Sequence, residues 1–412
     1  MEATFRRREG KSTIQRVVVG LSGGVDSSVS AYLLLKQGYE VIGLFMKNWH
    51  DDTVVLNSGC PWIEDSNDAL IVAQTLGIPF QTIDLSVEYK ERIVDYMFTE
   101  YSVGRTPNPD VLCNREIKFD IFLKTALQLG AHYVATGHYC QKRTFTNRGG
   151  TAVHRLIAGA DKRKDQSYFL CQLTQESLSY ALFPIGHLQK SEVRKIAAAQ
   201  GLITAHKKDS QGLCFVGKIK LPHFLQQQLK PQKGKIIEIA PDAATFEEHQ
   251  KNILAATSDM DILEAKTKPF DYSQEKGKCL GEHNGAHYFT IGQRRGLAVG
   301  GTPLPLFVIG IDTQINVIYV GQGKRHSGLY RSGLFIPNED THWLRPDLAL
   351  SVGEEHVFMV KIRYRQALRQ ATLYQRAEGL YIIFDEAERG ITAGQFAAWY
   401  QEEELIGSGV IA

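Results

Sequence analysis

The sequence predicts an α/β protein with a parallel sheet in its N-terminal half and a small β-barrel or sandwich at its C-terminal end. Over about the first 215 residues, short apolar strands alternate with amphipathic helices, which is typical of a parallel sheet. From about residue 326 onward, short strands with turns between them have apolar residues at a period of two, which is typical of a barrel or sandwich. Residues 357–364 and 379–384 are the clearest examples.

The N-terminal elements follow one another in a regular order. A short buried strand, Val17 to Val19, leads into a glycine-rich turn and then into a helix with apolar periodicity. Gly38 and Gly130 stand where a glycine commonly ends a helix. We expect strands at residues 17–19, 40–45, 80–84 and 133–136, and helices at residues 27–37, 66–76 and 115–129.

The middle of the chain differs in composition from both ends. Residues 231–280 are polar with few aromatic side chains, and residues 241–278 have helical character. We interpret this part as a small domain that carries an insertion near 238–279. The predicted domains are therefore residues 1–216, 217–325 and 326–412.

Length and composition limit the class of protein. A chain of 412 residues, with 43% hydrophobic and 22% charged residues, is typical of a globular protein of two or three domains. No apolar run approaches the roughly 20 residues that cross a bilayer. The basic N-terminus lacks the apolar stretch of a secretory signal. We expect a cytoplasmic protein without a membrane span.

Cysteine content and net charge exclude two further classes. The six cysteines are sparse and include no C-x-x-C pair, which favours a reducing compartment over a disulfide framework or a zinc ribbon. The net charge is only +2, so any nucleic-acid binding must come from local basic patches.

A glycine-rich turn between the first strand and the first helix predicts a phosphate site. Its sequence is SGGVDSS at positions 22–28. The two glycines let backbone N–H groups approach an anion, and Ser27 and Ser28 lie in the first turn of the helix, where the dipole favours phosphate. Asp26 would either support a metal ion or cap the helix. The string resembles the PP-loop of the ATP pyrophosphatase superfamily.

Two cysteines stand in contexts that favour reactivity. Cys113 follows a loop stiffened by two prolines and falls near the start of the next helix, where thiolate is favoured. Arg115 and Lys118 would strengthen this effect, and Asp110, three residues earlier, is a candidate general acid or base. Cys214 lies between glycines, in a segment suited to motion.

Several strings, taken in order along nearly the whole chain, resemble the tRNA-specific 2-thiouridylase family. They are SGGVDSS at 22–28, GLFMKNW at 43–49, TPNPDVLCNREIKF at 106–119, ATGHY at 135–139, KDQSYFL at 164–170, SQGLCF at 210–215 and the Gly394-Gln395 pair. The stretch from 238 to 279 is longer than this family leads us to expect. The resemblance implies an N-terminal PP-loop domain of the Rossmann-like HUP type, a small central domain and a C-terminal β-barrel.

Carried over position by position, the resemblance implies four sets of site residues. ATP phosphates would be bound by Gly20, Leu21, Ser22, Gly23, Gly24, Val25, Asp26 and Ser27, and the rest of the nucleotide by Met46 and Gly137. The target base would meet Asn108, Pro109 and Asp110. The tRNA would contact His138, Lys164, Asp165, Gln166, Arg363, Tyr364 and Gln395. Cys214 would carry a persulfide and Cys113 would form a disulfide with it during turnover; we assign no metal ligands.

The implied reaction is ATP-dependent thiolation of the wobble uridine, position 34, of tRNA. ATP would adenylate the oxygen on carbon 2, with release of pyrophosphate and AMP, and Mg²⁺ would accompany the nucleotide. The persulfide sulfur would then attack carbon 2, directly or as released hydrosulfide. The resemblance implies tRNAs for glutamate, glutamine and lysine, and a cysteine desulfurase or relay protein as sulfur donor.

Basic residues provide candidate contacts with the tRNA backbone. Patches occur at residues 162–164, 207–208 and 293–295. If residues 357–364 form one strand, Lys361, Arg363 and Arg365 share one face as a row of positive charge, with Tyr364 on the other. A solvated strand without function would have the same pattern. His138, at the end of a parallel strand, is a candidate ligand contact.

Two other functions remain open at this point. A PP-loop amide or guanidine synthase would accept nitrogen and would not need two reactive cysteines. A tRNA-binding module that had lost activity would not need Asp26, Asp110, Cys113 and Cys214 together.

Overall fold

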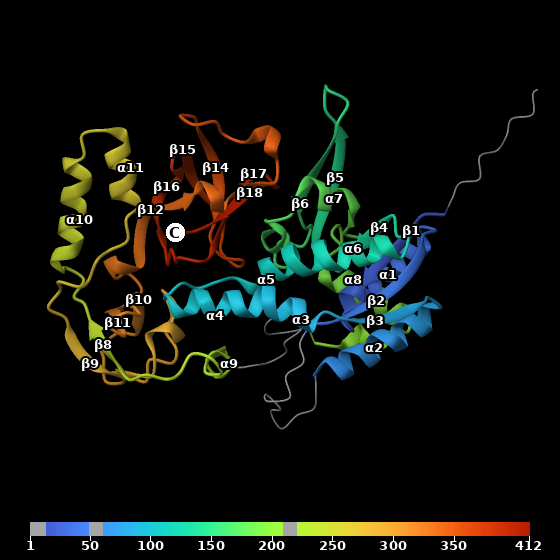
Figure 1. Cartoon of the computed structure of the whole chain (residues 1–412), viewed down its shortest axis with the longest axis horizontal. Coiled ribbons are helices and arrows are strands. Elements are labelled where there is room, and N and C mark those ends of the chain that lie inside the picture. The colour runs from blue at the N-terminus through green and yellow to red at the C-terminus, as the bar shows by residue number, and fades with distance from the viewer. Residues whose placement is uncertain (1–13, 49–60, 209–220) are drawn as a thin grey trace, which may run out of the picture.

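The chain forms three sheets that meet around a central helical run (Figure 1). The computed structural model describes residues 14–48, 61–208 and 221–412. In Figure 1 the first sheet lies at the right, the sheet that contains β12 to β18 at the upper centre, and β8 to β11 with two helices at the left. The described residues include no helix that is both long enough and apolar enough to cross a membrane.

The first sheet is parallel, as predicted. All four of its strand pairings run in the same direction. Its order is β3 (Phe80–Asp84), β2 (Glu40–Lys47), β1 (Arg16–Gly20), β4 (Tyr133–Ala135) and β7 (Ala181–Leu182). The chain moves from β1 outward to β3 and then returns to the other side of β1, so the switch in strand order lies between β1 and β4. Ligands of such sheets bind at the carboxyl ends of the strands beside the switch.

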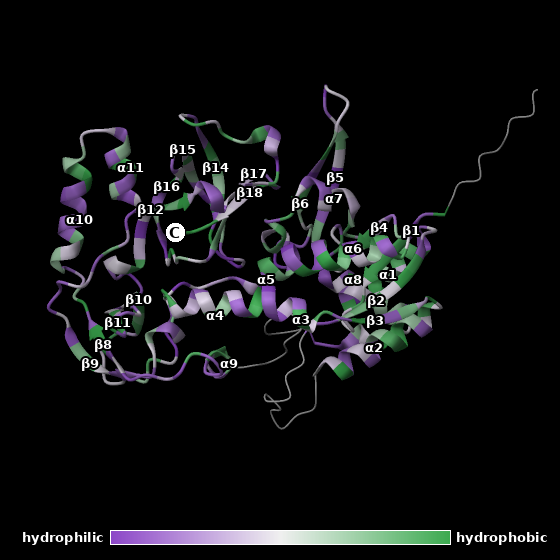
Figure 2. Cartoon of the chain, in the orientation of Figure 1, coloured by the Kyte–Doolittle hydropathy of each residue, from purple (hydrophilic) through white to green (hydrophobic). Residues whose placement is uncertain are grey.

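Alternating side chains bury both faces of this sheet. Val17 and Val19 pack with α1 (Val25–Lys36) and α2 (Pro61–Leu76). Val18, Leu44 and Met46 pack on the opposite face. Figure 2 shows the hydrophobic colour gathered around β1, β2 and α1.

The opposite face is covered by one long helical run. It passes through α5 (Pro109–Leu112), a π-helical stretch η3 (Cys113–Ile121) and α6 (Phe122–Gln128). We predicted its start at residue 115, but it begins six residues earlier. Asn108 caps it by accepting a bond from Val111 N at 3.3 Å, and a proline at the first position is compatible with a helix.

Shorter helices complete the first domain. α3 (Ser86–Tyr89), a π-helical stretch (Lys90–Val94) and α4 (Asp95–Ser102) follow β3, and α7 (Gln175–Tyr180) precedes β7. α8 (Lys190–Ala199) packs on α1 through Val193 and Ala197. Short 3₁₀ helices occur at Ser167–Leu170 and Ile203–His206. The next helix in the described residues is α9 (Leu221–Leu225).

The central sheet carries the predicted insertion. Its order is β10 (Leu306–Asp312), β11 (Val317–Gln322), β8 (Gly234–Glu238) and β9 (Lys278–His283). β8 and β9 pair antiparallel, and the chain between them forms α10 (Ala244–Ala255) and α11 (Asp259–Thr267). α11 buries Leu263 and Thr267, whereas α10 buries no residue fully. The helical character predicted for this stretch is confirmed; the domain boundaries stay a prediction.

The C-terminal strands form an antiparallel barrel. Their order is β12 (Tyr330–Pro337), β16 (Gly379–Arg389), β15 (Arg369–Gln375), β14 (Glu355–Lys361), β17 (Phe396–Gln401) and β18 (Glu404–Val410), with β13 (Thr341–Trp343) on β18. The last residue returns to the first strand, where Ala412 N donates to Phe335 O at 3.1 Å.

A hairpin from the first domain extends the barrel sheet. It consists of β5 (Cys140–Thr146) and β6 (Ala152–Ala158). β6 pairs with β18, so that Glu404 lies opposite Ile157 and Leu405 opposite Leu156. Hydrogen bonds of one sheet therefore join the first domain to the C-terminal barrel.

Buried histidines predict that stability depends on pH. Burial lowers the pKa of His326, which bonds to Ile239 O, and of His342, which bonds to Leu173 O. Between a lowered and an ordinary pKa, the unfolded chain binds more protons than the folded chain. The contribution of these two histidines to the free energy of unfolding is therefore fully present above about pH 6.5, and it is lost as the pH drops.

Urea unfolding at about pH 7.5 and about pH 5.5 measures this fall. His342→Gln should reduce it, whereas His223→Gln, at an exposed position, should leave it unchanged. An unfolding free energy that is equal at both pH values would contradict the prediction.

Candidate functional site

The predicted phosphate loop joins β1 to α1 at the carboxyl edge of the parallel sheet. Gly24 is the N-cap of α1, and no described side chain caps it, so the first N–H groups of the helix can bind an anion. Ser27 Oγ holds the loop closed, because it accepts from Ser22 N at 3.1 Å and donates to Gly24 O at 3.1 Å. Ser28 Oγ also donates to Gly24 O, at 2.8 Å.

Two glycines allow the backbone around this loop to approach closely. Gly23 has a φ of +69°, and a Cβ there would lie 2.1 Å from Asp65 O of α2. A Cβ on Gly137, which follows β4, would lie 2.7 Å from Ser27 N. The loop is therefore held between α2 and the turn after β4, at the switch point of the sheet, and its cradle fits a phosphate chain.

Asp26 takes part in a partly buried ion pair that the sequence did not reveal. Lys190 Nζ, at the start of α8, lies 2.7 Å and 2.8 Å from the two carboxylate oxygens of Asp26. Tyr139 Oη donates to the same carboxylate at 2.7 Å. Asp26 therefore does not cap the helix. No residue spacing links positions 26, 139 and 190, so only the fold could bring them together.

The other predicted nucleotide residues surround the same edge. Leu21, Val25 and Met46 are buried. Met46 Cε would lie 3.4 Å from a Cβ on Gly20, so the methionine packs over that glycine.

His138 is enclosed, with 8% of its surface exposed. Its Nδ1 lies 2.7 Å from Thr136 Oγ1, and its ring packs against Phe119 and Phe183. Burial, and then the positive charge of Lys118, lower the pKa of His138 well below its usual value. The ring is therefore neutral near pH 7.

The segment predicted to meet the target base begins the helical run α5–η3. Asn108 Oδ1 caps the helix by accepting from Val111 N, and the nearby Tyr168 hydroxyl donates to Phe396 O at 3.0 Å. Asp110 Oδ1 is buried and has no hydrogen-bond partner among the described residues. Asp110 and Cys113 are three residues apart in a helix, which places them on one face.

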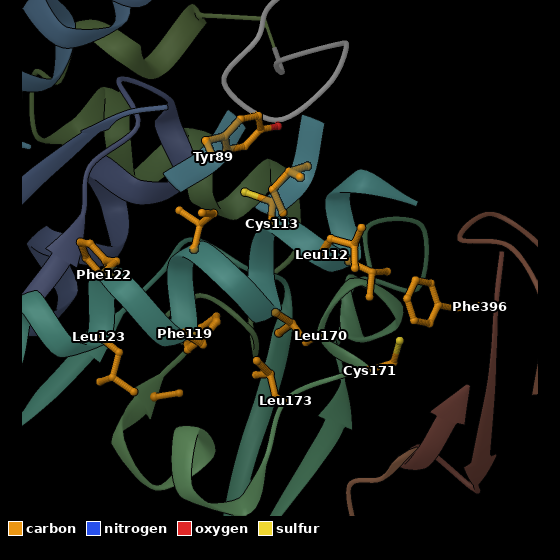
Figure 3. Packing of buried hydrophobic residues seen from close by; sticks show 14 of the residues in the cluster. Tyr89, Leu112, Cys113, Phe119, Phe122, Leu123, Leu170, Cys171, Leu173 and Phe396 are labelled. Atoms are coloured by element: carbon orange, nitrogen blue, oxygen red, sulfur yellow. The ribbon is translucent and has the colours of Figure 1, made fainter. Parts of the chain in front are cut away.

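Cys113 is fully buried in the core of the first domain. In Figure 3 it lies beside Tyr89, at one end of the cluster that also contains Phe122 and Phe396. The helix starts at Pro109, and the Cys113 N–H already donates to the carbonyls of Pro109 and Asp110. The prediction that Cys113 lies at a helix start was therefore wrong by a full turn.

The basic neighbours of Cys113 are held by other groups. Arg115 donates to Glu116 at 2.7 Å and to Gln172 at 3.0 Å. Lys118 donates to Asn114 Oδ1 at 3.0 Å.

Cys214 and its predicted disulfide lie outside the described residues, but both flanks are anchored. Lys207 Nζ lies 2.7 Å from Asp65 Oδ1 and also pairs with Asp68. Arg194 donates to Lys207 O at 2.9 Å. On the other flank, Phe224 stacks on Phe98 with ring centres 5.4 Å apart. Phe224 and Cys113 belong to one hydrophobic core.

Residues 105–107, just before the target-base segment, touch all three domains. Thr106 N donates to Ala393 O at 2.8 Å. Gln395 Nε2 donates to Thr106 O at 2.8 Å and to Pro107 O at 3.2 Å. Thr106 Oγ1 donates to Thr290 Oγ1 of the central domain at 3.2 Å. Gln395, predicted as a tRNA contact, thus binds the residues just before the target-base segment.

The other predicted tRNA contacts meet at the seam between the first domain and the barrel. Tyr364 Oη donates to Lys164 O at 3.4 Å, and the Tyr364 ring lies 4.3 Å from that of Phe169. Asp165 accepts from Gly159 N and from Ser167 N. Gln166 Oε1 accepts from Tyr139 N at 3.0 Å, which links this segment to the partner of Asp26.

The predicted row of positive charge was wrong. β14 ends at Lys361, so residues 361, 363 and 365 do not share a strand face. Lys361 is buried and pairs with Asp165 at 3.5 Å. Arg363 Nη2 donates to Ile291 O and Gly390 O, both at 2.9 Å, and burial lowers its pKa. Of the three, only Arg365 is exposed.

Three family models match successive parts of the chain. Residues 15–218 match a family described as tRNA methyl transferase HUP domain, residues 261–322 a tRNA methyl transferase PRC-barrel domain, and residues 336–411 an aminomethyltransferase beta-barrel domain. The match to the central domain begins within α11, so α10 lies outside all three.

Three bacterial relatives carry the same name, tRNA-specific 2-thiouridylase MnmA. The protein of Christiangramia forsetii is 63% identical over 97% of this chain and 100% of its own length. That of Flavobacterium johnsoniae is 61% identical with the same coverage. That of Karelsulcia muelleri is 46% identical over 97% of this chain and 99% of its own.

The Asp26–Lys190 pair predicts a defect in nucleotide binding. In Lys190→Met the Asp26 carboxylate stays beside the loop without its cation and repels phosphate. We expect affinity for a non-hydrolysable ATP analogue to fall roughly tenfold or more, measured by calorimetry. Lys195→Met, at an exposed position of the same helix, is the control. Equal affinity in Lys190→Met and the native protein would refute the role of this pair.

Proposed function

This chain belongs to the tRNA-specific 2-thiouridylase family, and on that basis we propose that it thiolates carbon 2 of the wobble uridine, position 34, of tRNA. The protein is an ATP-dependent tRNA sulfurtransferase. The site assignment rests on the placement of Cys113 and Asp110 about one turn apart on the same helical run. Cys113 is buried, and Asp110 Oδ1 has no hydrogen-bond partner among the described residues. Both stand on the helical run that covers the sheet carrying the phosphate loop.

The loop at residues 20–27 holds the phosphates of ATP. Its helix N-terminus and the close contacts at Gly23 and Gly137 suit that role. When bound, ATP supplies the adenylyl group that turns the oxygen on carbon 2 into a leaving group. Mg²⁺ accompanies the phosphates; the described residues contain no cluster of three His, Cys, Asp or Glu that would hold a metal by itself.

Sulfur transfer uses the two cysteines in sequence. The terminal sulfur of a persulfide on Cys214 attacks carbon 2 of the uracil. The Cys113 thiolate attacks the Cys214 Sγ atom and breaks its bond to that sulfur. A Cys113–Cys214 disulfide forms, AMP departs with the former carbon-2 oxygen, and an external thiol reduces the disulfide. Asp110 moves the proton at this site.

The base must leave its stack to reach a site enclosed in this way. The partners of the reaction are tRNAs for glutamate, glutamine and lysine, and a cysteine desulfurase or a relay protein that supplies the persulfide. The reductant that recycles the disulfide and the sparse cysteines fit a cytoplasmic location.

Two other functions fit the fold less well. A PP-loop synthase that accepts nitrogen has no use for Cys113 beside Asp110. A binding module without activity has no use for a phosphate loop whose carboxylate is neutralised by Lys190.

The test of the proposed function is formation of 2-thiouridine by the purified protein. Unmodified tRNA, ATP and a desulfurase system are supplied, and nucleosides are analysed by mass spectrometry. Cys113→Ser and Cys214→Ser should each lower the rate roughly 100-fold or more, because each removes a sulfur that the transfer needs. Cys279→Ser, at an exposed cysteine of the central sheet, should retain the native rate. Full turnover in both active-site variants would refute the sulfur mechanism.

A second prediction concerns Asp110. Asp110→Asn keeps the shape but loses the proton acceptor, so kcat for thiolation should fall roughly 100-fold. Affinity for ATP should not change. Asp120→Asn, further along the same helical run and paired with Arg92, is the matched control. An unchanged kcat in Asp110→Asn would exclude it as the general acid or base.

A further inference from the structure

The Asn48 side chain is a buried amide without a hydrogen-bond partner among the described residues. The residue directly follows β2 and has 1% of its surface exposed. Neither its Oδ1 nor its Nδ2 atom finds a hydrogen bond within the described ranges. A buried amide that satisfies neither group costs free energy, so such a residue calls for a ligand that would satisfy it.

The alternation of β2 places Asn48 on the face of the sheet that carries Cys113. Leu44 and Met46 point into the core that contains Cys113, Val111 and Tyr89. Val41 and Phe45 point to the other face, toward α1 and α2. Successive side chains of a strand alternate, and continuing this alternation by the one position that follows Lys47 places Asn48 on the side of Leu44 and Met46. It stands at the carboxyl end of the strand, the edge where ligands of parallel sheets bind.

A second unsatisfied group belongs to the same face. Asp110 Oδ1 is buried without a partner among the described residues, and its helix packs on this face through Val111 and Cys113. The Asn108 Oδ1 atom already accepts from Val111 N at 3.3 Å as the helix cap. Asn48 and Asp110 therefore both offer, among the described residues, buried polar atoms that could meet a polar ring here.

We propose that Asn48 reads the Watson–Crick edge of the flipped uracil, which rests on the function proposed above. Its Nδ2 donates to O4 and its Oδ1 accepts from N3–H, as an amide pairs with a base edge. These two contacts turn carbon 2 and its oxygen toward Asp110 and Cys113. Asn48 is thus a residue that determines specificity for uracil.

Adenine offers an edge that an amide can also pair with, so the nucleotide is the competing ligand. The face decides between them: Asn48 lies on the side of Cys113 and Asp110, where the thiolated base must be. Affinity for ATP measured separately distinguishes the two ligands.

The experiment compares tRNA transcripts that carry uridine or cytidine at the wobble position. Asn48→Asp keeps the acceptor and loses the donor, so it no longer pairs with O4 but still accepts from the amino group of cytosine. We expect the ratio of kcat/KM for uridine over cytidine, from 2-thiouridine and 2-thiocytidine yields, to fall roughly tenfold or more. Asn48→Ala removes both groups and should also lower the ratio. Asn252→Asp, exposed on α10, should leave it unchanged.

The ratio does not depend on the fraction of protein that is folded, so a purely structural role of Asn48 would not move it. An unchanged ratio in both Asn48 variants would overturn the proposal. A weaker calorimetric Kd for ATP with an unchanged ratio would assign Asn48 to adenine and overturn it too. Absence of 2-thiouridine with the native protein would refute the proposed function itself, and with it this inference.

Discussion

The hydrogen bonds that hold residues 105–107 to the barrel and the central domain set the position of everything that follows on the helical run. The Thr106 carbonyl accepts a hydrogen bond from Gln395, its N–H donates to Ala393 O, and its hydroxyl donates to Thr290. The helix begins three residues later, at Pro109, so this junction fixes the positions of Asp110 and Cys113. The barrel therefore shapes the reaction site even though the phosphate loop lies in another domain.

Charged side chains around the site are held by other groups of the protein. Lys190 neutralises Asp26, Lys361 meets Asp165, and Arg363 is held by backbone carbonyls. A charge removed from water needs such partners, because unpaired it would cost several kcal/mol. Lys361 and Arg363 therefore bind groups of the protein at the seam between the first domain and the barrel.

The carboxyl edge of the parallel sheet concentrates the groups that await a ligand. The phosphate loop follows β1, Gly137 and His138 follow β4, and Asn48 follows β2. The helical run that carries Asp110 packs through Val111 and Cys113 on the face of the sheet that contains Leu44 and Met46. A nucleotide and a pyrimidine can thus meet along one edge, with the thiol of Cys113 below them in the core.

The sequence by itself determined the element types, the parallel sheet, the phosphate loop and the two candidate cysteines, because these depend on local periodicity, glycine placement and short strings. It also located the helical insertion between β8 and β9. Only the tertiary structure decided that Lys190 faces Asp26 and that Lys361 and Arg363 turn inward. It also decided that the Asn48 amide is buried without a hydrogen-bond partner among the described residues. Those facts follow from contacts between residues far apart in the chain, where burial and the end of a strand fix which way a side chain points.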